Sequence, residues 1–329
     1  MGVLLSVENV VGGYEFESLG KKIYVDAVSN VSISIDDNVV FGIAGESGCG
    51  KSTLLKIMYG YIISPLKVLR GNIKIFTSND SYIDVLSISS ELRRSRVWWK
   101  EISWIPQNAM NVLNPVEKIK DHFVEILTTH ERIDKDDALK IATEYVESFG
   151  LSKSVLDAYP HQLSGGMRQR VVIALALLLK PKVVLADEPT SALDVVVQRG
   201  VLQILLNKQS ELKNTVVLVS HDMGVHAMVT NKLAVMYAGK VVEIGRTEDI
   251  FEKPLHPYTK ALIDSLPRIG DKTLRTGLAG SPPDLRNPPP GCRFHPRCPF
   301  AMDICRKEEP PMIEIEKNRF VSCWLYIRR

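Results

Sequence analysis

A chain of 329 residues can bury a large core, and its length suggests two structural units rather than one. Its composition, with 45% hydrophobic and 24% charged residues, is that of an ordinary globular protein, and the formal net charge of +3 gives no reason to expect nucleic acid as a partner. The longest apolar run, residues 171–179, is about half as long as a membrane-spanning helix, so we expect no transmembrane segment. The start of the sequence has no basic stretch followed by an apolar core, which argues against a secretion signal.

A glycine-rich stretch, GESGCGKST at residues 45–53, follows an apolar run typical of a buried strand and precedes a predicted helix. Gly45, Gly50, Lys51 and Ser52 satisfy the spacing G-x-x-x-x-G-K-S. Glycines let the backbone turn its N–H groups inward, and the start of a helix adds positive potential, so the stretch predicts a phosphate-binding loop. Lys51 is placed to contact the β- and γ-phosphates, and the Ser52 hydroxyl to ligate Mg²⁺. Because chance alone gives this spacing in roughly 1% of such chains, a second element is needed.

A second glycine turn, Ser164–Gly165–Gly166, opens a predicted helix and has the same anion-binding construction. Within one subunit only one of the two helix starts can face a given γ-phosphate. The sequence therefore predicts a head-to-tail pair of subunits that exchange these loops across an interface.

Two adjacent carboxylates, Asp187 and Glu188, end a further apolar run in KVVLADEPTSALD. Acids at the end of a buried strand are costly unless a cation or a catalytic role keeps them there, the alternative being a solvated strand end. We expect Asp187 to hold Mg²⁺ and Glu188 to polarise the attacking water. With the loop upstream, this pair indicates a nucleotide site.

Together these motifs resemble the ATP-binding subunits of ABC transporters: GESGCGKST their Walker A, VVLADEP their Walker B, and LSGGM a variant of the signature LSGGQ that departs at Met167. The resemblance implies an α/β P-loop fold, with a RecA-like core and a helical subdomain at about residues 85–165. It also implies that the remaining residues of the loop bind ATP, namely Glu46, Ser47, Gly48, Cys49 and Thr53.

Three further motifs carry over from the same resemblance. Gln107 matches the Q-loop, and with Ser52 and Asp187 it is expected to be a ligand of Mg²⁺. His221 follows a third apolar run and matches the switch histidine, which contacts the γ-phosphate. The D-loop that links the two sites of a dimer matches Ser191, Ala192, Leu193 and Asp194.

The adenine ring is expected to stack on an aromatic side chain upstream of the loop. Tyr14, at the end of the first predicted strand, matches the position of the stacking aromatic in the family. Tyr24 is the rival, because an insertion-like segment lies between the two tyrosines.

After about residue 245 the composition changes: twelve of the eighteen prolines lie from Pro254 onward, and four of the five cysteines lie in the last 38 residues. We therefore expect a nucleotide-binding domain at 1–245 and an irregular extension at 246–329 that needs something other than a core to order it.

The cysteines of the extension are spaced C-x5-C-x6-C-x17-C. Disulfide bonds between these cysteines would not suit a reducing compartment. A zinc site usually shows two short C-x2–4-C pairs, whereas an iron–sulfur cluster tolerates wider spacing of its four cysteines. The remaining alternative is four unligated thiols. HPYTKALIDSLPRIG, GSPPDL and PPPGCRFHPRCPF resemble the C-terminal extension of oligopeptide and dipeptide permease ATP-binding subunits, D type. That resemblance implies a [4Fe–4S] cluster held by Cys292, Cys298, Cys305 and Cys323. We expect the cluster to have a structural role rather than a redox role.

The resemblance also implies partners: a second, F-type ATP-binding subunit, two membrane permeases and an extracytoplasmic solute-binding protein, at the cytoplasmic face of the membrane. Trp98, Trp99 and Trp104 either line the groove that receives a permease helix or pack in the core. The predicted function is ATP hydrolysis that powers peptide import; the alternatives are import of oligosaccharides and a non-transport ABC ATPase.

Overall fold

The structure of the protein is a computed structural model with side chains. It describes residues 2–18, 20–78, 81–108, 112–191, 193–266, 278 and 280–327. The chain forms two compact units, one of residues 1–87 with 218–329 and the other of residues 88–217. The first unit contains both the predicted phosphate-binding loop and the described part of the proline-rich extension.

One sheet of the first unit is antiparallel and has the strand order β2-β1-β4-β5. The strands are β1 (Val3–Ser18), β2 (Lys21–Asp36), β4 (Leu66–Ser78) and β5 (Ser81–Asp84). Period-two alternation explains the end of β2, where Val31, Ile33 and Ile35 are buried and the two serines between them are exposed.

The second sheet of this unit has the order β11-β12-β10-β9-β3. All five residues of β3 are buried, as expected for a strand covered on both faces, and β3 pairs in parallel with β9. The strands are β3 (Val40–Ala44), β9 (Lys232–Tyr237), β10 (Lys240–Arg246), β11 (Ile313–Glu316) and β12 (Arg319–Val321). Because β12 pairs with both β10 and β11, residues 313–321 join this sheet late in the chain.

Helices complete the first unit. The phosphate loop leads into the first of them, whose buried residues face the core. They are α1 (Lys51–Tyr59), α7 (Met223–Val229), α8 (Thr247–Glu252), α9 (Pro257–Asp264) and α10 (Asp303–Lys307).

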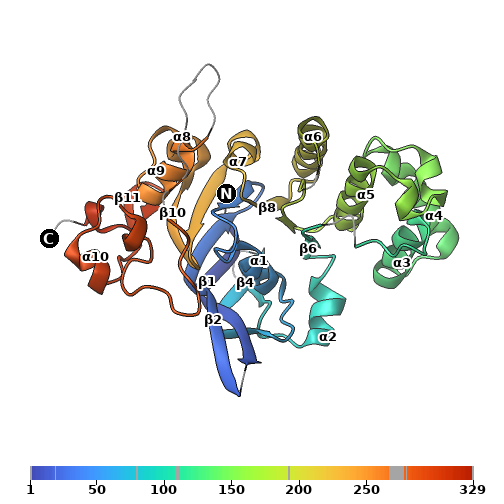
Figure 1. The fold of residues 1–329 in the computed structure, drawn as a ribbon. Helices are drawn as coiled ribbons and strands as arrows, with labels where there is room; N and C mark the ends of the chain where they lie inside the picture. Colours follow the sequence, from blue (N-terminus) through green and yellow to red (C-terminus); the bar gives the residue numbers. More distant parts are fainter. Residues whose placement is uncertain are drawn as a thin grey trace. The chain divides into compact units, whose positions relative to one another are not determined.

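The second unit is mostly helical around two parallel strands, β6 (Ile102–Ile105) and β7 (Val183–Asp187). Three of its helices, α3, α4 and α5, pack on one another (Figure 1). The helices are α2 (Ser90–Leu92), α3 (Ile119–Glu131), α4 (Lys135–Glu147), α5 (Gly165–Leu177) and α6 (Val195–Leu212). Strand β8 (Thr215–Ser220) crosses the division between the units.

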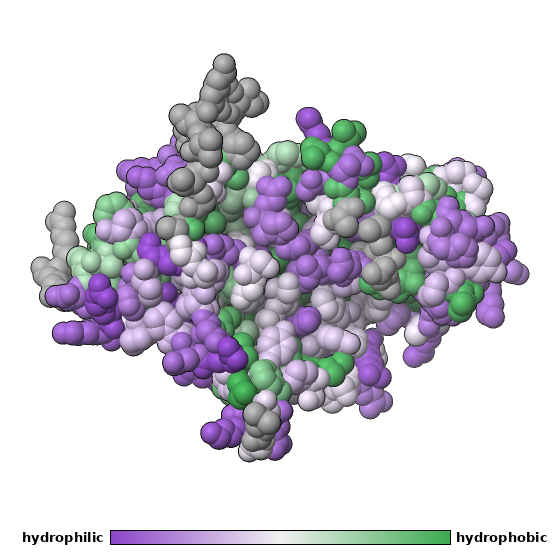
Figure 2. Space-filling model, in the orientation of Figure 1, coloured by the Kyte–Doolittle hydropathy of each residue, from purple (hydrophilic) through white to green (hydrophobic). Residues whose placement is uncertain are grey.

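None of the helices that the structure describes is long and apolar enough to span a bilayer. On the face shown in Figure 2, hydrophilic residues predominate and apolar residues form small separate patches, which is an ordinary distribution for a protein surface.

The strand that precedes the phosphate loop packs against a buried histidine, His226 of α7. A Cβ added at Gly42 of β3 would lie 2.6 Å from His226 Nδ1, so glycine is required for this close packing. His226 Nε2 lies 3.2 Å from the Ser220 carbonyl oxygen and therefore carries the hydrogen. Burial is the main cause that lowers the pKa of His226 to about 4, and Lys51 lowers it further.

His226 is therefore expected to make the fold sensitive to acid. Since its pKa is lower in the folded state, the unfolded state binds more protons, and stability falls as pH drops from about 6.5 toward 4. The unfolding free energy of the wild type is expected to fall between pH 8 and pH 5, and His226 accounts for about 2 kcal/mol of that fall. In His226→Gln the fall is expected to be smaller by this amount. Urea unfolding at both pH values measures the unfolding free energy, and substitution of the exposed His161 by Gln is the control. Equal pH dependence of stability in wild type and His226→Gln would contradict the assignment to His226.

Candidate nucleotide-binding site

The loop at residues 45–50 has the backbone geometry of an anion-binding turn. Gly45, Gly48 and Gly50 all have positive φ angles, of 150°, 79° and 105°. A Cβ at Gly45 would lie 2.2 Å from the Met236 carbonyl oxygen, and a Cβ at Gly50 would lie 2.0 Å from that of Ala27. Glycine is therefore required at both ends of the loop for two independent reasons, the dihedral angle and the close approach of other backbone.

Lys51, the first residue of α1, is 5% exposed and its ammonium group points back over the loop. Nζ donates to the carbonyl oxygens of Gly45 and Glu46, at 2.7 and 2.9 Å, and lies 3.7 Å from Cys49 Sγ. The positive charge of Lys51 is thus held next to the backbone of the loop. Burial raises the pKa of Cys49, so its thiol stays neutral beside the lysine.

Tyr14 borders the loop. Its hydroxyl group lies 3.0 Å from Thr53 Oγ1, in the first turn of α1, while Ser52 beside it is partly exposed. The rival Tyr24 has a buried hydroxyl for which the described residues offer no hydrogen-bond partner, and its ring lies over Gly13. Which tyrosine stacks on adenine stays a prediction, but of the two only Tyr14 has a hydrogen bond to a residue of the loop.

The second unit brings two predicted catalytic residues together. Gln107 Nε2 donates to Glu188 Oε2 at 3.3 Å. Glu188 has a φ angle of 47°, a left-handed conformation that is rare for a residue with a Cβ and often marks functional positions. Asp187, the last residue of β7, is 2% exposed. The two adjacent carboxylates thus lie at the end of a buried strand, and their roles in hydrolysis stay a prediction.

The signature and D-loop residues begin two helices of the second unit. The Ser164 hydroxyl accepts a hydrogen bond from the Met167 N–H, so Ser164 is the N-cap of α5, and Gly165 and Gly166 form its first turn. Asp194 caps α6 by accepting from the backbone N–H groups of the second and third helical residues. Of the other D-loop residues, Ser191 and Leu193 precede this cap and Ala192 lies outside the described residues.

His221 follows β8 in the first unit and is exposed. Its role as a side chain that contacts the γ-phosphate stays a prediction.

The four cysteines of the extension all lie in the first unit. Burial raises the pKa of Cys292 to about 11, with further increases from Cys305 and Cys298. Burial also raises the pKa of Cys323 to about 12, and the other three cysteines add to that shift. The four thiols are therefore within electrostatic reach of each other.

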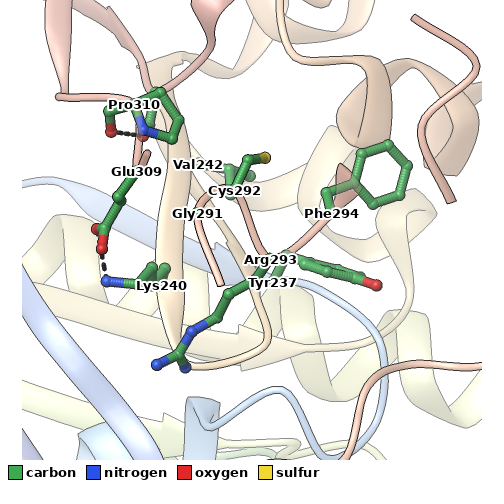
Figure 3. Close-up of a pocket in the computed structure, with 10 residues that line it drawn as sticks. Tyr237, Lys240, Val242, Gly291, Cys292, Arg293, Phe294, Glu309 and Pro310 are labelled. Atoms are coloured by element: carbon green, nitrogen blue, oxygen red, sulfur yellow. Dashed lines mark hydrogen bonds and ion pairs between the residues drawn. The ribbon is translucent and has the colours of Figure 1, made fainter. Parts of the chain in front are cut away.

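The predicted cluster finds no direct support, however. Within the described ranges, no group of three or more His, Cys, Asp or Glu side chains is arranged so that it could hold a metal ion. The cavity beside Cys292 measures about 20 Å³, room for roughly one water, and is lined by Cys292 alone among the cysteines (Figure 3). For Mg²⁺ the same finding excludes nothing, because Mg²⁺ needs only one or two protein ligands beside phosphates and water.

Two residues that contact the loop were missed by the sequence analysis. Tyr258 Oη accepts the backbone N–H of Glu46 at 2.9 Å, and Arg297 forms a two-pronged ion pair with the Glu46 carboxylate. HPYTKAL and FHPRC, which contain them, were noted only as a resemblance. Nothing in their spacing shows that they meet a loop about 200 residues earlier in the chain.

Residues 28–191 match the family "ABC transporter", and residues 242–305 match "Oligopeptide/dipeptide transporter, C-terminal region". The dipeptide transport ATP-binding protein DppD of Caldanaerobacter subterraneus subsp. tengcongensis is 41% identical, over 99% of this chain and 98% of that protein. DppD of Bacillus subtilis is 40% identical, over 100% and 96%, and OppD of the same species 39%, over 92% and 84%.

The chain belongs to the dipeptide and oligopeptide branch of the ABC transporter ATP-binding proteins. The predicted P-loop ABC fold is confirmed by solved structures. The ATP-binding cassette MJ0796, in a dimeric post-hydrolysis state bound to ADP and Pi, is 27% identical with a TM-score of 0.63, over 74% of this chain and 99% of that one. A second dimeric structure of MJ0796 matches with the same TM-score at 28% identity. The present chain, as an ABC transporter ATP-binding protein, is an ATPase.

Gly50→Ala tests the close approach in the loop. We expect ATP affinity to fall more than about tenfold, since the added methyl group forces the loop away from the Ala27 carbonyl. Gly20→Ala is the control: Gly20 has a similar positive φ of 73° but open space around its Cβ position, so it carries only the conformational cost of about 1 kcal/mol. Titration with a fluorescent ATP analogue measures both; equal affinity in the two variants would contradict the argument.

Proposed function

We propose that this protein binds and hydrolyses ATP to power the import of peptides through a membrane permease. The observation that carries the proposal is the combination, in one chain, of the glycine-shaped phosphate loop with Lys51 and the paired Gln107 and Glu188 side chains. The peptide substrate is supported by the full-length relatives, which are named as dipeptide and oligopeptide transport proteins.

Each group of the site has a distinct task in this chemistry. The N–H groups of the loop and Lys51 bind the β- and γ-phosphates, and Ser52 with Asp187 and Gln107 would hold Mg²⁺, which supplies charge neutralisation on the phosphates. Glu188 orients the attacking water, with its carboxylate fixed by Gln107. His221 would contact the γ-phosphate. Positioning and electrostatic stabilisation supply the rate, without a covalent intermediate.

The signature turn is proposed to act on the nucleotide of a second ATP-binding subunit. Ser164, Gly165 and Gly166 form a helix start in the second unit, a ready anion-binding site, while the phosphate loop lies in the first. The dimeric state of MJ0796 bound to ADP and Pi supports such a pair. A heterodimer with an F-type subunit is our preferred arrangement, with the D-loop at its interface.

A groove in the second unit is proposed to receive a permease helix. The cavity measures about 890 Å³, and its lining includes Trp98 and Trp99 but not Trp104. The lining also contains both basic side chains, such as Arg94 and Arg132, and acidic ones, Glu91 and Glu131, which suits a short amphipathic segment. The protein would thereby attach to the cytoplasmic face of the membrane, beside two permeases that receive peptide from a solute-binding protein.

We also propose that the four cysteines of the extension hold a [4Fe–4S] cluster with a structural role. The support is chemical: the proline-rich segment contains four cysteines, and four cysteine thiolates are the usual ligand set of such a cluster.

Glu188→Gln tests the hydrolytic assignment and the transport function together. We expect ATPase turnover to fall by about 100-fold or more, because the water loses its base, with ATP affinity within about threefold of wild type. Uptake of a labelled dipeptide into vesicles carrying the assembled transporter is expected to stop. Glu147→Gln, an exposed carboxylate on α4, is the control; unchanged turnover in Glu188→Gln would remove it from the mechanism.

Metal analysis tests the cluster. Anaerobically purified protein is expected to be brown and to hold about four irons per chain. Cys298→Ala should lose the iron, whereas Cys49→Ser should keep it, since Cys49 lies in the phosphate loop. One zinc and no iron per chain would overturn the proposal.

A further inference from the structure

The C-terminal extension reaches the phosphate loop through a buried arginine. Arg297 Nη1 donates to Glu46 Oε2 at 2.7 Å, and Nη2 donates to Oε1 at 3.0 Å. The Arg297 side chain is 5% exposed and that of Glu46 is 23% exposed. A two-pronged pair with one partner almost fully buried is held in a single geometry and is screened little by salt.

The surroundings of Arg297 fix its direction. Its guanidinium carbon lies 5.8 Å from the centre of the Tyr237 ring, and its nitrogens also reach the Tyr237 hydroxyl and the Leu278 carbonyl oxygen, each at 3.4 Å. Tyr237 packs in turn against Tyr258 and Phe294. The arginine is therefore anchored in the core that the extension shares with β9.

The same core also holds the backbone of Glu46. The buried Tyr258 of α9 accepts the Glu46 N–H at 2.9 Å, and the Glu46 carbonyl accepts Lys51 Nζ at 2.9 Å. The side chain, the N–H and the carbonyl of one loop residue are thus each held by a different partner, two of which belong to the part of the chain after residue 245.

Glu46 presents an electrostatic problem that Arg297 solves. Its carboxylate belongs to a loop whose ligand is a polyanion, so an unpaired negative charge there would repel the phosphates. The ion pair with Arg297 neutralises the negative charge of the Glu46 carboxylate. The neutralising group comes from a segment that follows the ATPase motifs in the sequence by more than 70 residues, His221 to Arg297.

We propose that Arg297 is a positioning residue for ATP binding: it orients and neutralises Glu46, so that the affinity of the phosphate loop for ATP depends on the C-terminal extension. Arg297 acts through Glu46 and does not take part in hydrolysis. Its loss therefore affects ATP binding and leaves the chemical step intact.

A charge-removal cycle in the full-length protein tests this. For Arg297→Gln we expect the Kd and KM for ATP to rise by about tenfold with kcat within about twofold of wild type, because the partly buried Glu46 is left unpaired. Arg297→Lys keeps the charge but loses the two-pronged geometry, and a smaller rise of about threefold is expected. The decisive variant is the double substitution Glu46→Gln, Arg297→Gln, which removes both charges and is expected to restore Kd to within about threefold of wild type.

Arg286→Gln is the matched control. Arg286 makes a two-pronged pair with Asp284 in the same extension, but this pair is exposed and does not contact the loop. Its substitution is expected to leave the Kd for ATP unchanged. Thermal unfolding of every variant shows whether it is folded.

Two results would overturn the proposal. If the double variant binds ATP as weakly as Arg297→Gln, the arginine acts only as a structural tie and not by neutralising Glu46. If Arg297→Gln leaves Kd and KM unchanged while kcat falls, it acts on the chemical step. Neither result bears on the assignment of Glu188 or on peptide transport, which are tested separately.

Discussion

The fit of a six-residue loop between other stretches of backbone is the constraint on which the rest depends. Residues 45–50 turn with positive φ angles at three glycines, while carbonyl oxygens of Ala27 and Met236 lie where side-chain atoms would be. The loop can present N–H groups to phosphate only because β3 and β9 on one side and β2 on the other are packed tightly around it. The buried His226 under Gly42 extends the same tight packing into the strand that leads to the loop.

The residues that we propose for ATP binding and hydrolysis are divided between two compact units. The loop, Lys51 and His221 belong to the first, and Gln107, Asp187, Glu188 and the signature turn to the second. In the second unit the functional groups stand at element ends: Glu188 follows β7, Ser164 caps α5 and Asp194 caps α6. Strand and helix ends are where backbone groups lack partners within the element, so they are available for a nucleotide.

The extension is ordered by the core of the first unit rather than by itself. Strand β12 pairs with β10, and the buried Arg293 contacts the Ala238 carbonyl oxygen, Asp26 and Ser29. A proline-rich segment with few apolar residues gains order from such borrowed partners. Two other contacts join the extension to the phosphate loop, since Tyr258 and Arg297 both bind Glu46.

The sequence by itself determined the family and the P-loop fold, because glycine spacing, a lysine and carboxylates after apolar runs are local patterns with a physical reason at each position. The chemical groups that it assigned to the site stay predictions. It also indicated that the extension differs from the rest, although the domain division at residue 245, the Tyr14 assignment and the metal ligands stay predictions. Only the tertiary structure decided that Glu188 is held by Gln107 across 81 positions of sequence and that Arg297 meets Glu46 across 251. Ion pairs and hydrogen bonds between distant segments leave no periodic trace in a single sequence, so they become visible only when the chain is folded.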